Sequence, residues 1–374
     1  MDSKKSMFGK HKGRIIFWAL ICLAFTVAVF KFSDLQELWL NIKQANPFFI
    51  SLAIFSQFFY FCLFTITYKI SFQMVNIKYT FRRLFPLTFA YIFVNVVAPT
   101  FGASGPALFA TEASHRKDSP IRALAGVLIA NIAQFLTFSV VLLFGIFYLY
   151  STRDLKFYQI IAASLLLLLT AFLCSLFILS FKKPSALKYY LFWQIKLLNN
   201  IFIFVRSKRR INNDWVEDGV KEFVLASKNI TKQKEKIKSL IIAYFFVHAV
   251  NIMSLYFIFL AFNQHILFRA LIAGFVMGVL FQIVGITPYG IGLTETAMAL
   301  TFTSLDVPTE TAVLITLTFR GVTFWLPFII GFILLRKVHI FGLKDVSVVK
   351  IILENKHVTN IKKAIKIRLI DIEK

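Results

Sequence analysis

Charged residues are scarce in this sequence, and acidic residues are the scarcest. Of 374 residues only 16% are charged, with 18 acids against 42 bases, whereas 58% are hydrophobic. A water-soluble chain of this length would form two or so domains with charged surfaces. The shortage excludes an ordinary soluble enzyme and favours a protein whose outer surface faces lipid.

Cysteine and histidine are also rare. The three cysteines (Cys22, Cys62 and Cys174) all lie in apolar runs, where packing residues are expected rather than disulfide partners. His248 has no second ligand at a metal-binding spacing. We therefore expect no metal site and no cofactor.

Long apolar runs make up most of the chain. A helix needs about 20 apolar residues to span the hydrocarbon core of a bilayer. The runs that approach or exceed this length are Ile15–Phe30, Phe48–Tyr68, Ile121–Tyr150, Phe157–Phe181, Leu240–Phe262 and Thr309–Leu335. The first follows a basic leader without a small-residue cleavage site, so we expect a retained signal anchor. The sequence thus predicts an all-α, polytopic membrane protein with about six full spans.

Two further apolar segments, Leu84–Ser114 and Phe268–Ser304, are broken by glycine and proline. Their limbs are too short to cross alone, since the 15 residues of Leu84–Ala98, at about 1.5 Å each, fall short of the roughly 30 Å core. Unwound backbone survives in a bilayer only where protein or a water-filled cavity covers it, and paired breaks are typical of transporter substrate sites. The break residues are Pro99, Gly102, Ser104, Gly105 and Pro106 in the first segment and Thr287, Pro288, Gly290, Gly292 and Thr294 in the second.

The distribution of basic residues predicts the orientation. Thirty-six of the 42 lie in residues 1–14, 69–83, 115–122, 182–238 and 336–374, which the positive-inside rule places in the cytoplasm together with both termini. This requires the first broken segment to enter and leave from the cytoplasmic side, and the second from the outer side. We therefore predict two re-entrant helical hairpins of opposite orientation; the alternative is that one of them is a kinked full span.

The two halves of the chain then form an inverted repeat. A shift of 189 residues carries Pro99 onto Pro288, and it carries the spans that flank the first break close to those that flank the second. Each half reads as span, hairpin and span. We treat residues 1–374 as one transmembrane domain, with a basic insert at 182–238 and a basic tail at 338–374.

The break motifs resemble those of a known family. The first reads Pro99-Thr-Phe-Gly-Ala-Ser-Gly-Pro-Ala, and the second reads Thr287-Pro-Tyr-Gly-Ile-Gly-Leu-Thr-Glu295, followed by Arg320-Gly-Val-Thr-Phe-Trp325-Leu-Pro327. Over most of residues 14–337 the chain resembles the lysylphosphatidylglycerol synthase transmembrane-region family, also called UPF0104 or flippase-like. The resemblance implies lipid translocation without synthesis, because the soluble aminoacyltransferase domain of the fused members has no room here. Some members carry Gly-Glu-x-x-Arg after the first break where this chain has Gly105-Pro106, so the headgroup need not be the same.

Arg320 is the strongest candidate for a substrate-binding or gating residue. An arginine at the bilayer centre costs about 2.5–3.5 kcal/mol even on the lenient insertion scale, which indicates an anionic ligand or a partner such as Glu295 or Glu310. For Glu295 three roles stay open: a proton or cation site, the partner of Arg320, or a plain first-turn carboxylate that complements the helix dipole. The other candidates are polar residues near the breaks or spaced i, i+3 on a span: Asn95, Asn131, Gln134, His248, Asn251 and Gln282. Such groups also serve as plain hydrogen bonds between helices.

Two local predictions concern helix ends. Ser104 and Thr294 are placed to cap the second limbs, so that exposed N–H groups would suit a phosphate headgroup. Glu112 precedes Arg116 by four residues, which favours an ion pair at the helix end.

Membrane lipid is the expected partner, either an anionic phospholipid or a polyprenyl-linked lipid. The basic segments lie beside membrane spans, where they suit the anionic inner leaflet rather than nucleic acid. A second copy of the chain or a lipid-modifying enzyme stays open as a protein partner. Two other functions also stay open: a glycosyltransferase with a lipid-linked donor, and a scaffold for a separate lipid-modifying enzyme.

The topology predicts a labelling pattern. Single cysteines at Lys117 and Asp306, in a background without the native three, should react with membrane-impermeant reagents from opposite sides of the membrane. Labelling of both positions from one side would contradict the inverted hairpins.

Overall fold

The computed structural model describes residues 45–97, 104–183, 185, 189, 223–225, 227, 229–285 and 287–338. Within these ranges the chain is helical and contains no strand, so the predicted all-α multi-pass fold is confirmed. Several predictions lie outside the described residues: the first span, Pro99 and Gly102, and most of the basic insert and tail.

Five long apolar stretches have the length of membrane spans in the described part of the chain. They are α3 (Pro47–Met74), α6 (Pro120–Ser151), α7 (Phe157–Lys182), α10 (Lys234–Ala261) and Thr309–Leu334. The last is composite: α13 (Thr309–Arg320), the π-helical turn η3 (Gly321–Trp325) and α14 (Leu326–Val338). Two spans begin alike, because Asn46 and Ser119 each accept a backbone N–H through the side chain and each precedes a proline, a combination that starts helices.

Each broken segment forms a pair of short helices that pack against each other. The pairs are α4 (Phe81–Val97) with α5 (Ser104–His115), and α11 (Phe268–Val284) with α12 (Leu293–Ser304), the latter joined through the 3-10 turn η2 (Pro288–Gly290). In both pairs the first helix has 17 residues and the second has 12. At about 1.5 Å per residue neither length reaches across a core of about 30 Å.

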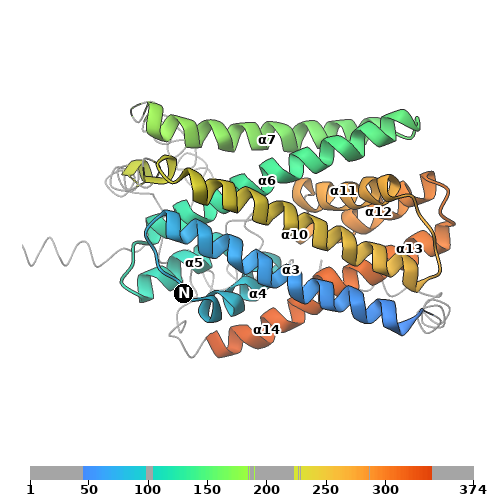
Figure 1. Cartoon of the computed structure of the whole chain (residues 1–374), viewed down its shortest axis with the longest axis horizontal. Coiled ribbons are helices and arrows are strands. Elements are labelled where there is room, and N and C mark those ends of the chain that lie inside the picture. The colour runs from blue at the N-terminus through green and yellow to red at the C-terminus, as the bar shows by residue number, and fades with distance from the viewer. Residues whose placement is uncertain are drawn as a thin grey trace, which may run out of the picture.

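The repeat is visible in the helix lengths and in their arrangement. Helices α3 and α10 both have 28 residues, and a shift of 189 carries α5 onto α12. Figure 1 shows the α4–α5 pair at one end of the bundle and the α11–α12 pair toward the opposite end. The side of the membrane to which each pair opens stays a prediction.

The two halves are interlocked. Helices α3 and α10 pack along each other, and the last span of each half lies against the short helices of the other: α6 against α11, and α14 against α4. Small residues permit these approaches. A Cβ on Gly331 would lie 2.4 Å from the Phe89 carbonyl oxygen, and one on Gly145 would lie 3.2 Å from Val276. Each hairpin is therefore packed against a span of the other half.

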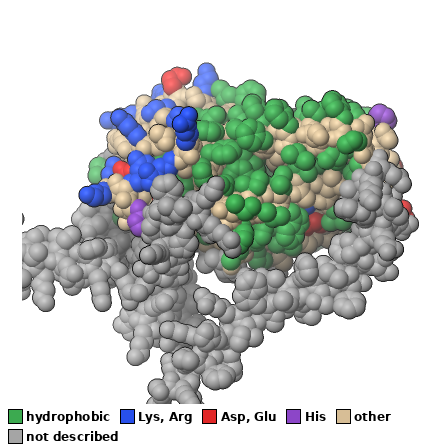
Figure 2. All heavy atoms as spheres, turned by 90° about the horizontal axis from the view of Figure 1, so that it is seen from below, with side chains coloured by type: hydrophobic (Ala, Val, Ile, Leu, Met, Phe, Trp, Pro, Cys, Tyr) green, Lys and Arg blue, Asp and Glu red, His purple; other side chains and the backbone are tan. Residues whose placement is uncertain are grey.

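Basic side chains gather at one end of the molecule. Figure 2 shows Lys and Arg at the left end, where α5 leads into α6, and a mainly hydrophobic surface over the rest. At this end Glu112 pairs with Arg83 at 2.6 Å, whereas Arg116 lies 3.5 Å from Asp118. The predicted Glu112–Arg116 pair is therefore wrong, because α4 brings a closer guanidinium to Glu112.

The packing of α11 on α12 predicts a stability effect. A Cβ on Gly274 would lie 2.1 Å from the buried Phe302 ring, whereas one on Gly321 would meet nothing within 4 Å. Gly274→Ala should destabilise the fold by about 1–3 kcal/mol, the usual cost of overpacking, and lower the melting temperature in detergent. Gly321→Ala is the matched control and should leave the melting temperature unchanged or slightly higher. Equal melting temperatures for the two variants would contradict this close packing.

Candidate functional site

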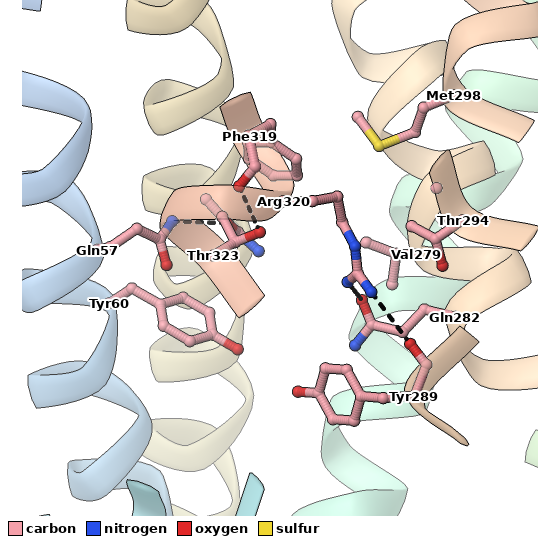
Figure 3. Close-up of a pocket in the computed structure, with 12 residues that line it drawn as sticks. Gln57, Tyr60, Val279, Gln282, Tyr289, Thr294, Met298, Phe319, Arg320 and Thr323 are labelled. Atoms are coloured by element: carbon pink, nitrogen blue, oxygen red, sulfur yellow. Dashed lines mark hydrogen bonds between the residues drawn. The ribbon is translucent and has the colours of Figure 1, made fainter. Parts of the chain in front are cut away.

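A small polar cavity lies at the second break, where the two halves of the bundle meet. Its volume is about 30 Å³, which exceeds the roughly 10–15 Å³ that one water requires. Figure 3 shows side chains from both halves pointing toward one another across it. The lining residues are Gln57, Tyr60, Asn251, Gly278, Val279, Gln282, Tyr289, Thr294, Met298, Phe319, Arg320 and Thr323.

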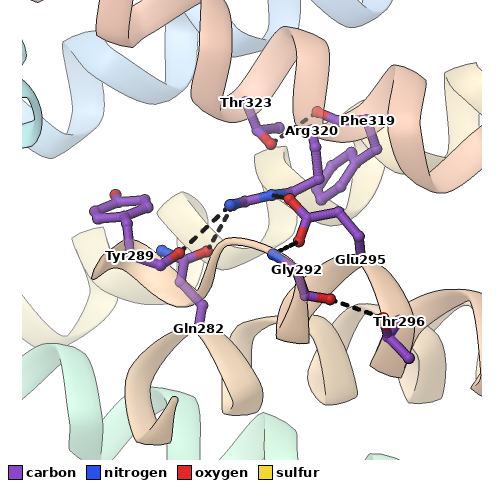
Figure 4. Close-up of polar contacts among 8 residues, drawn as sticks. All are labelled: Gln282, Tyr289, Gly292, Glu295, Thr296, Phe319, Arg320 and Thr323. Carbon is purple, nitrogen blue, oxygen red and sulfur yellow. Dashed lines mark hydrogen bonds and ion pairs between the residues drawn. The ribbon is translucent and has the colours of Figure 1, made fainter. Parts of the chain in front are cut away.

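Arg320 supplies the positive charge of this cavity and is only 2% exposed. Its Nε donates to Glu295 Oε1 at 2.6 Å, while Nη1 and Nη2 reach the Gln282 side-chain oxygen and the Tyr289 carbonyl at 3.4 Å each. The guanidinium also lies 4.5 Å from the centre of the Phe324 ring, a cation–π geometry. Figure 4 shows the contacts with Glu295, Gln282 and Tyr289 converging on the Arg320 side chain.

Glu295 pairs with Arg320 and also accepts a hydrogen bond from the backbone at the second break. Its Oε2 accepts the backbone N–H of Gly292 at 2.7 Å, just before α12 begins. A carboxylate at this position is also favoured by the positive end of the helix. Both oxygens of Glu295 are therefore engaged.

The conformation of the break depends on residues that adopt positive φ. Gly290 and Gly292 have φ of 68° and 85°, and Tyr289 has φ of 55°. Glycine takes such angles without steric cost. The prediction that Thr294 caps α12 is wrong, because Gly292 precedes the helix and Thr294 is its second residue.

Two buried acceptors of the cavity have no partner among the described residues. The Gln57 Oε1 and Thr294 Oγ1 atoms make no hydrogen bond, and each residue is 2% exposed. The Gln57 amide nitrogen donates to Asn251 Oδ1 at 2.8 Å, which links α3 to α10. An unsatisfied buried polar group costs about 1–3 kcal/mol, so this cavity favours water or a polar ligand.

The structure brings together four of the eight predicted polar residues. Arg320, Gln282 and Asn251 line the cavity, and Glu295 lies directly behind Arg320. The other four lie outside the lining. Asn95 Oδ1 accepts hydrogen bonds from Gly105 N and Ser104 Oγ at the first break. His248 Nε2 lies 3.1 Å from Thr137 Oγ1, and Asn131 and Gln134 are half-buried on α6. The Ser104 hydroxyl thus bonds to Asn95, and the Asn95 oxygen holds the first turn of α5.

Sequence reasoning missed Gln57, Tyr60, Tyr289 and Thr323, which also line the cavity. Gln57 could have been predicted as a site residue, because it is the one amide side chain in the apolar run Phe48–Tyr68. The others are aromatic or hydroxyl residues, which are common in spans and carry no such signal.

The charged pair belongs to one half of the repeat. The shift of 189 residues that carries α5 onto α12 also carries Asn131 onto Arg320 and Pro106 onto Glu295. The first half therefore has a neutral amide and a proline where the second half has the ion pair. The polar site at the second break has no charged counterpart at the equivalent positions of the first half.

Comparison with known proteins gives a consistent result. The family model described as the lysylphosphatidylglycerol synthase TM region matches residues 15–331. A UPF0104 membrane protein of Pyrococcus horikoshii is 24% identical over 303 residues, covering 79% of this chain and 89% of that protein. A UPF0104 membrane protein of Methanocaldococcus jannaschii is 22% identical over 319 residues, covering 84% and 92%. One of Methanothermobacter thermautotrophicus is 21% identical over 326 residues, covering 85% and 93%.

The Arg320–Glu295 pair predicts a coupled stability effect. Removing one partner of a buried pair leaves an uncompensated charge and typically costs about 3–5 kcal/mol. Arg320→Gln and Glu295→Gln should each lower the melting temperature strongly, and the double variant should recover much of the loss. Arg269→Gln removes an exposed arginine outside the cavity and should change stability little. Additive losses in the double variant would contradict the pairing.

Proposed function

The chain belongs to the lysylphosphatidylglycerol synthase transmembrane-region family, and from that premise we propose that it is a lipid translocase. It moves the headgroup of a phospholipid, or of another lipid-linked molecule, between the leaflets of the cell membrane. The headgroup passes through the second break, while the acyl or prenyl chains stay in the bilayer. In this proposal both termini are cytoplasmic.

The observation that carries the proposal is the buried Arg320 beside an interrupted helix. Broken helices at membrane depth are typical of substrate sites in secondary transporters, and a buried guanidinium suits a phosphate through its planar fork. The cavity lies between α3 and α10 on one side and the α11–α12 pair on the other. It therefore lies at the interface between the two repeats. In secondary transporters the substrate site lies at this interface, and one repeat moves against the other during alternating access.

The structure represents a closed state in this account. A cavity of about 30 Å³ holds about two waters, which is too little for a headgroup. The cavity has two points at which the backbone can bend to open it. They are the residues of the break that adopt positive φ and the π-helical turn η3 that directly follows Arg320. Single π-helical turns are frequent at functional sites and mark points where a helix bends.

The transport proposal predicts the behaviour of variants at the break. Reconstituted protein should accelerate leaflet exchange of a fluorescent phospholipid or polyprenyl-linked lipid. Gly290→Val and Gly292→Val should each suppress exchange, because a residue with a branched side chain is strained at positive φ and the break would no longer keep its present conformation. Membrane insertion should persist, since the spans are untouched.

The control for this assay is Leu300→Val on the exposed face of α12, which should exchange lipid at the wild-type rate. Arg320→Lys should lose exchange despite keeping its charge, because lysine lacks the bidentate fork. Exchange equal to that of protein-free vesicles, across phospholipids and polyprenyl lipids, would favour the scaffold function. Sugar transfer in the same preparation would favour the glycosyltransferase.

A further inference from the structure

The guanidinium of Arg320 is held unevenly. Its Nε edge makes a short contact with Glu295, 2.6 Å long, whereas Nη1 and Nη2 make contacts of 3.4 Å. Good N–H···O bonds measure about 2.7–3.2 Å, so the two amino groups are loosely engaged. Figure 4 shows them directed toward Gln282 and the Tyr289 carbonyl, away from the carboxylate. A phosphate can take this edge bidentately while Glu295 stays in place and positions the guanidinium.

The atoms around this edge are neutral. Apart from Arg320, the cavity lining consists of amides, hydroxyls, aromatic and aliphatic groups. Gln57 Oε1 and Thr294 Oγ1 are buried and unpartnered among the described residues. An amide oxygen and a hydroxyl of this kind suit the hydroxyl groups of a ligand.

Among the described residues, the cavity lining contains no carboxylate that is free to bind a cation. Both oxygens of Glu295 are engaged, by Arg320 Nε and by Gly292 N–H. The other carboxylates of the described ranges lie in loops or in terminal turns of helices: Glu112, Asp118, Asp154, Glu235, Asp306 and Glu310. The undescribed sequence 98–103 contains no acidic residue. A ligand ammonium in this cavity would find no free carboxylate oxygen, because Arg320 and the Gly292 N–H already occupy both oxygens of Glu295, the carboxylate nearest to it in the described part of the chain.

From this geometry we propose that the site selects a headgroup with one phosphodiester and an uncharged, hydroxyl-bearing remainder. The phosphate oxygens accept hydrogen bonds from Nη1 and Nη2 of Arg320, and the ligand hydroxyls form hydrogen bonds with Gln57 Oε1 and Thr294 Oγ1. Headgroups with an added ammonium, including an aminoacylated phosphatidylglycerol, are disfavoured. This inference rests on the proposed function, in that the same cavity is the translocation site.

Binding to the full-length protein in nonionic detergent tests the proposal. Thermal stabilisation by short-chain phosphatidylglycerol, its lysyl ester, phosphatidylcholine and acyl-free glycerophosphoglycerol gives an apparent affinity for each, because a ligand that binds the folded state raises its stability. Phosphatidylglycerol should bind at least about tenfold more tightly than the lysyl ester or phosphatidylcholine, a difference of about 1.4 kcal/mol. Weak binding of glycerophosphoglycerol, competitive with the lipid, would show that the headgroup is recognised directly.

Matched variants locate the binding. Thr294→Val and Thr316→Val each remove a buried hydroxyl that has no partner among the described residues, but only Thr294 lines the cavity. Thr294→Val should weaken phosphatidylglycerol binding several-fold, whereas Thr316→Val should not. Arg320→Lys should abolish the preference, whereas Arg269→Gln should preserve it.

The outcomes separate this inference from the proposed function. Equal or tighter binding of the lysyl ester, or phosphatidylglycerol binding that Arg320→Lys and Thr294→Val leave unchanged, would overturn the headgroup assignment even if leaflet exchange is observed. Selective binding that follows the variants, without leaflet exchange, would support the headgroup assignment and count against translocation alone.

Discussion

The ion pair between Arg320 and Glu295 holds the second break together. Each partner is costly to bury alone, and each also contacts the broken segment. Glu295 binds the Gly292 N–H, and Arg320 reaches the Gln282 side chain and the Tyr289 carbonyl. One pair thus joins α13 to the unwound backbone between α11 and α12. Without it the break would expose polar backbone to an apolar surrounding, which membranes do not tolerate.

The ion pair lies where the two halves of the bundle pack against each other. Helix α14 packs against α4, and α6 packs against α11, so each hairpin is packed against a span of the other half. The π-helical turn after Arg320 lies between the site and α14, where a wider turn allows the two parts of the span to reorient. The cavity, the turn and the cross-packed helices are therefore parts of one arrangement around the Arg320–Glu295 pair.

The sequence predicted the helices of this fold well, because length and hydropathy determine spans and glycine with proline determines breaks. The α5–α12 correspondence follows from the same spacing that relates Pro99 to Pro288. The interaction partners of individual polar and charged residues were harder to predict. Glu112 pairs with Arg83, 29 residues earlier, because tertiary packing brings α4 closer than the neighbouring turn. The capping role of Glu295 and the place of Gln57 in the cavity likewise depend on how helices meet, which periodicity alone does not specify.

The most direct test of the account is a structure of the protein in nanodiscs containing phosphatidylglycerol, determined by electron cryomicroscopy with a bound antibody fragment. We expect phosphate density within hydrogen-bonding distance of Arg320 Nη1 and Nη2, with Glu295 still on Nε and the cavity enlarged beside Gln57 and Thr294. Lipid density confined to the outer surface of the bundle, with the cavity at its present size in every class of particles, would contradict it.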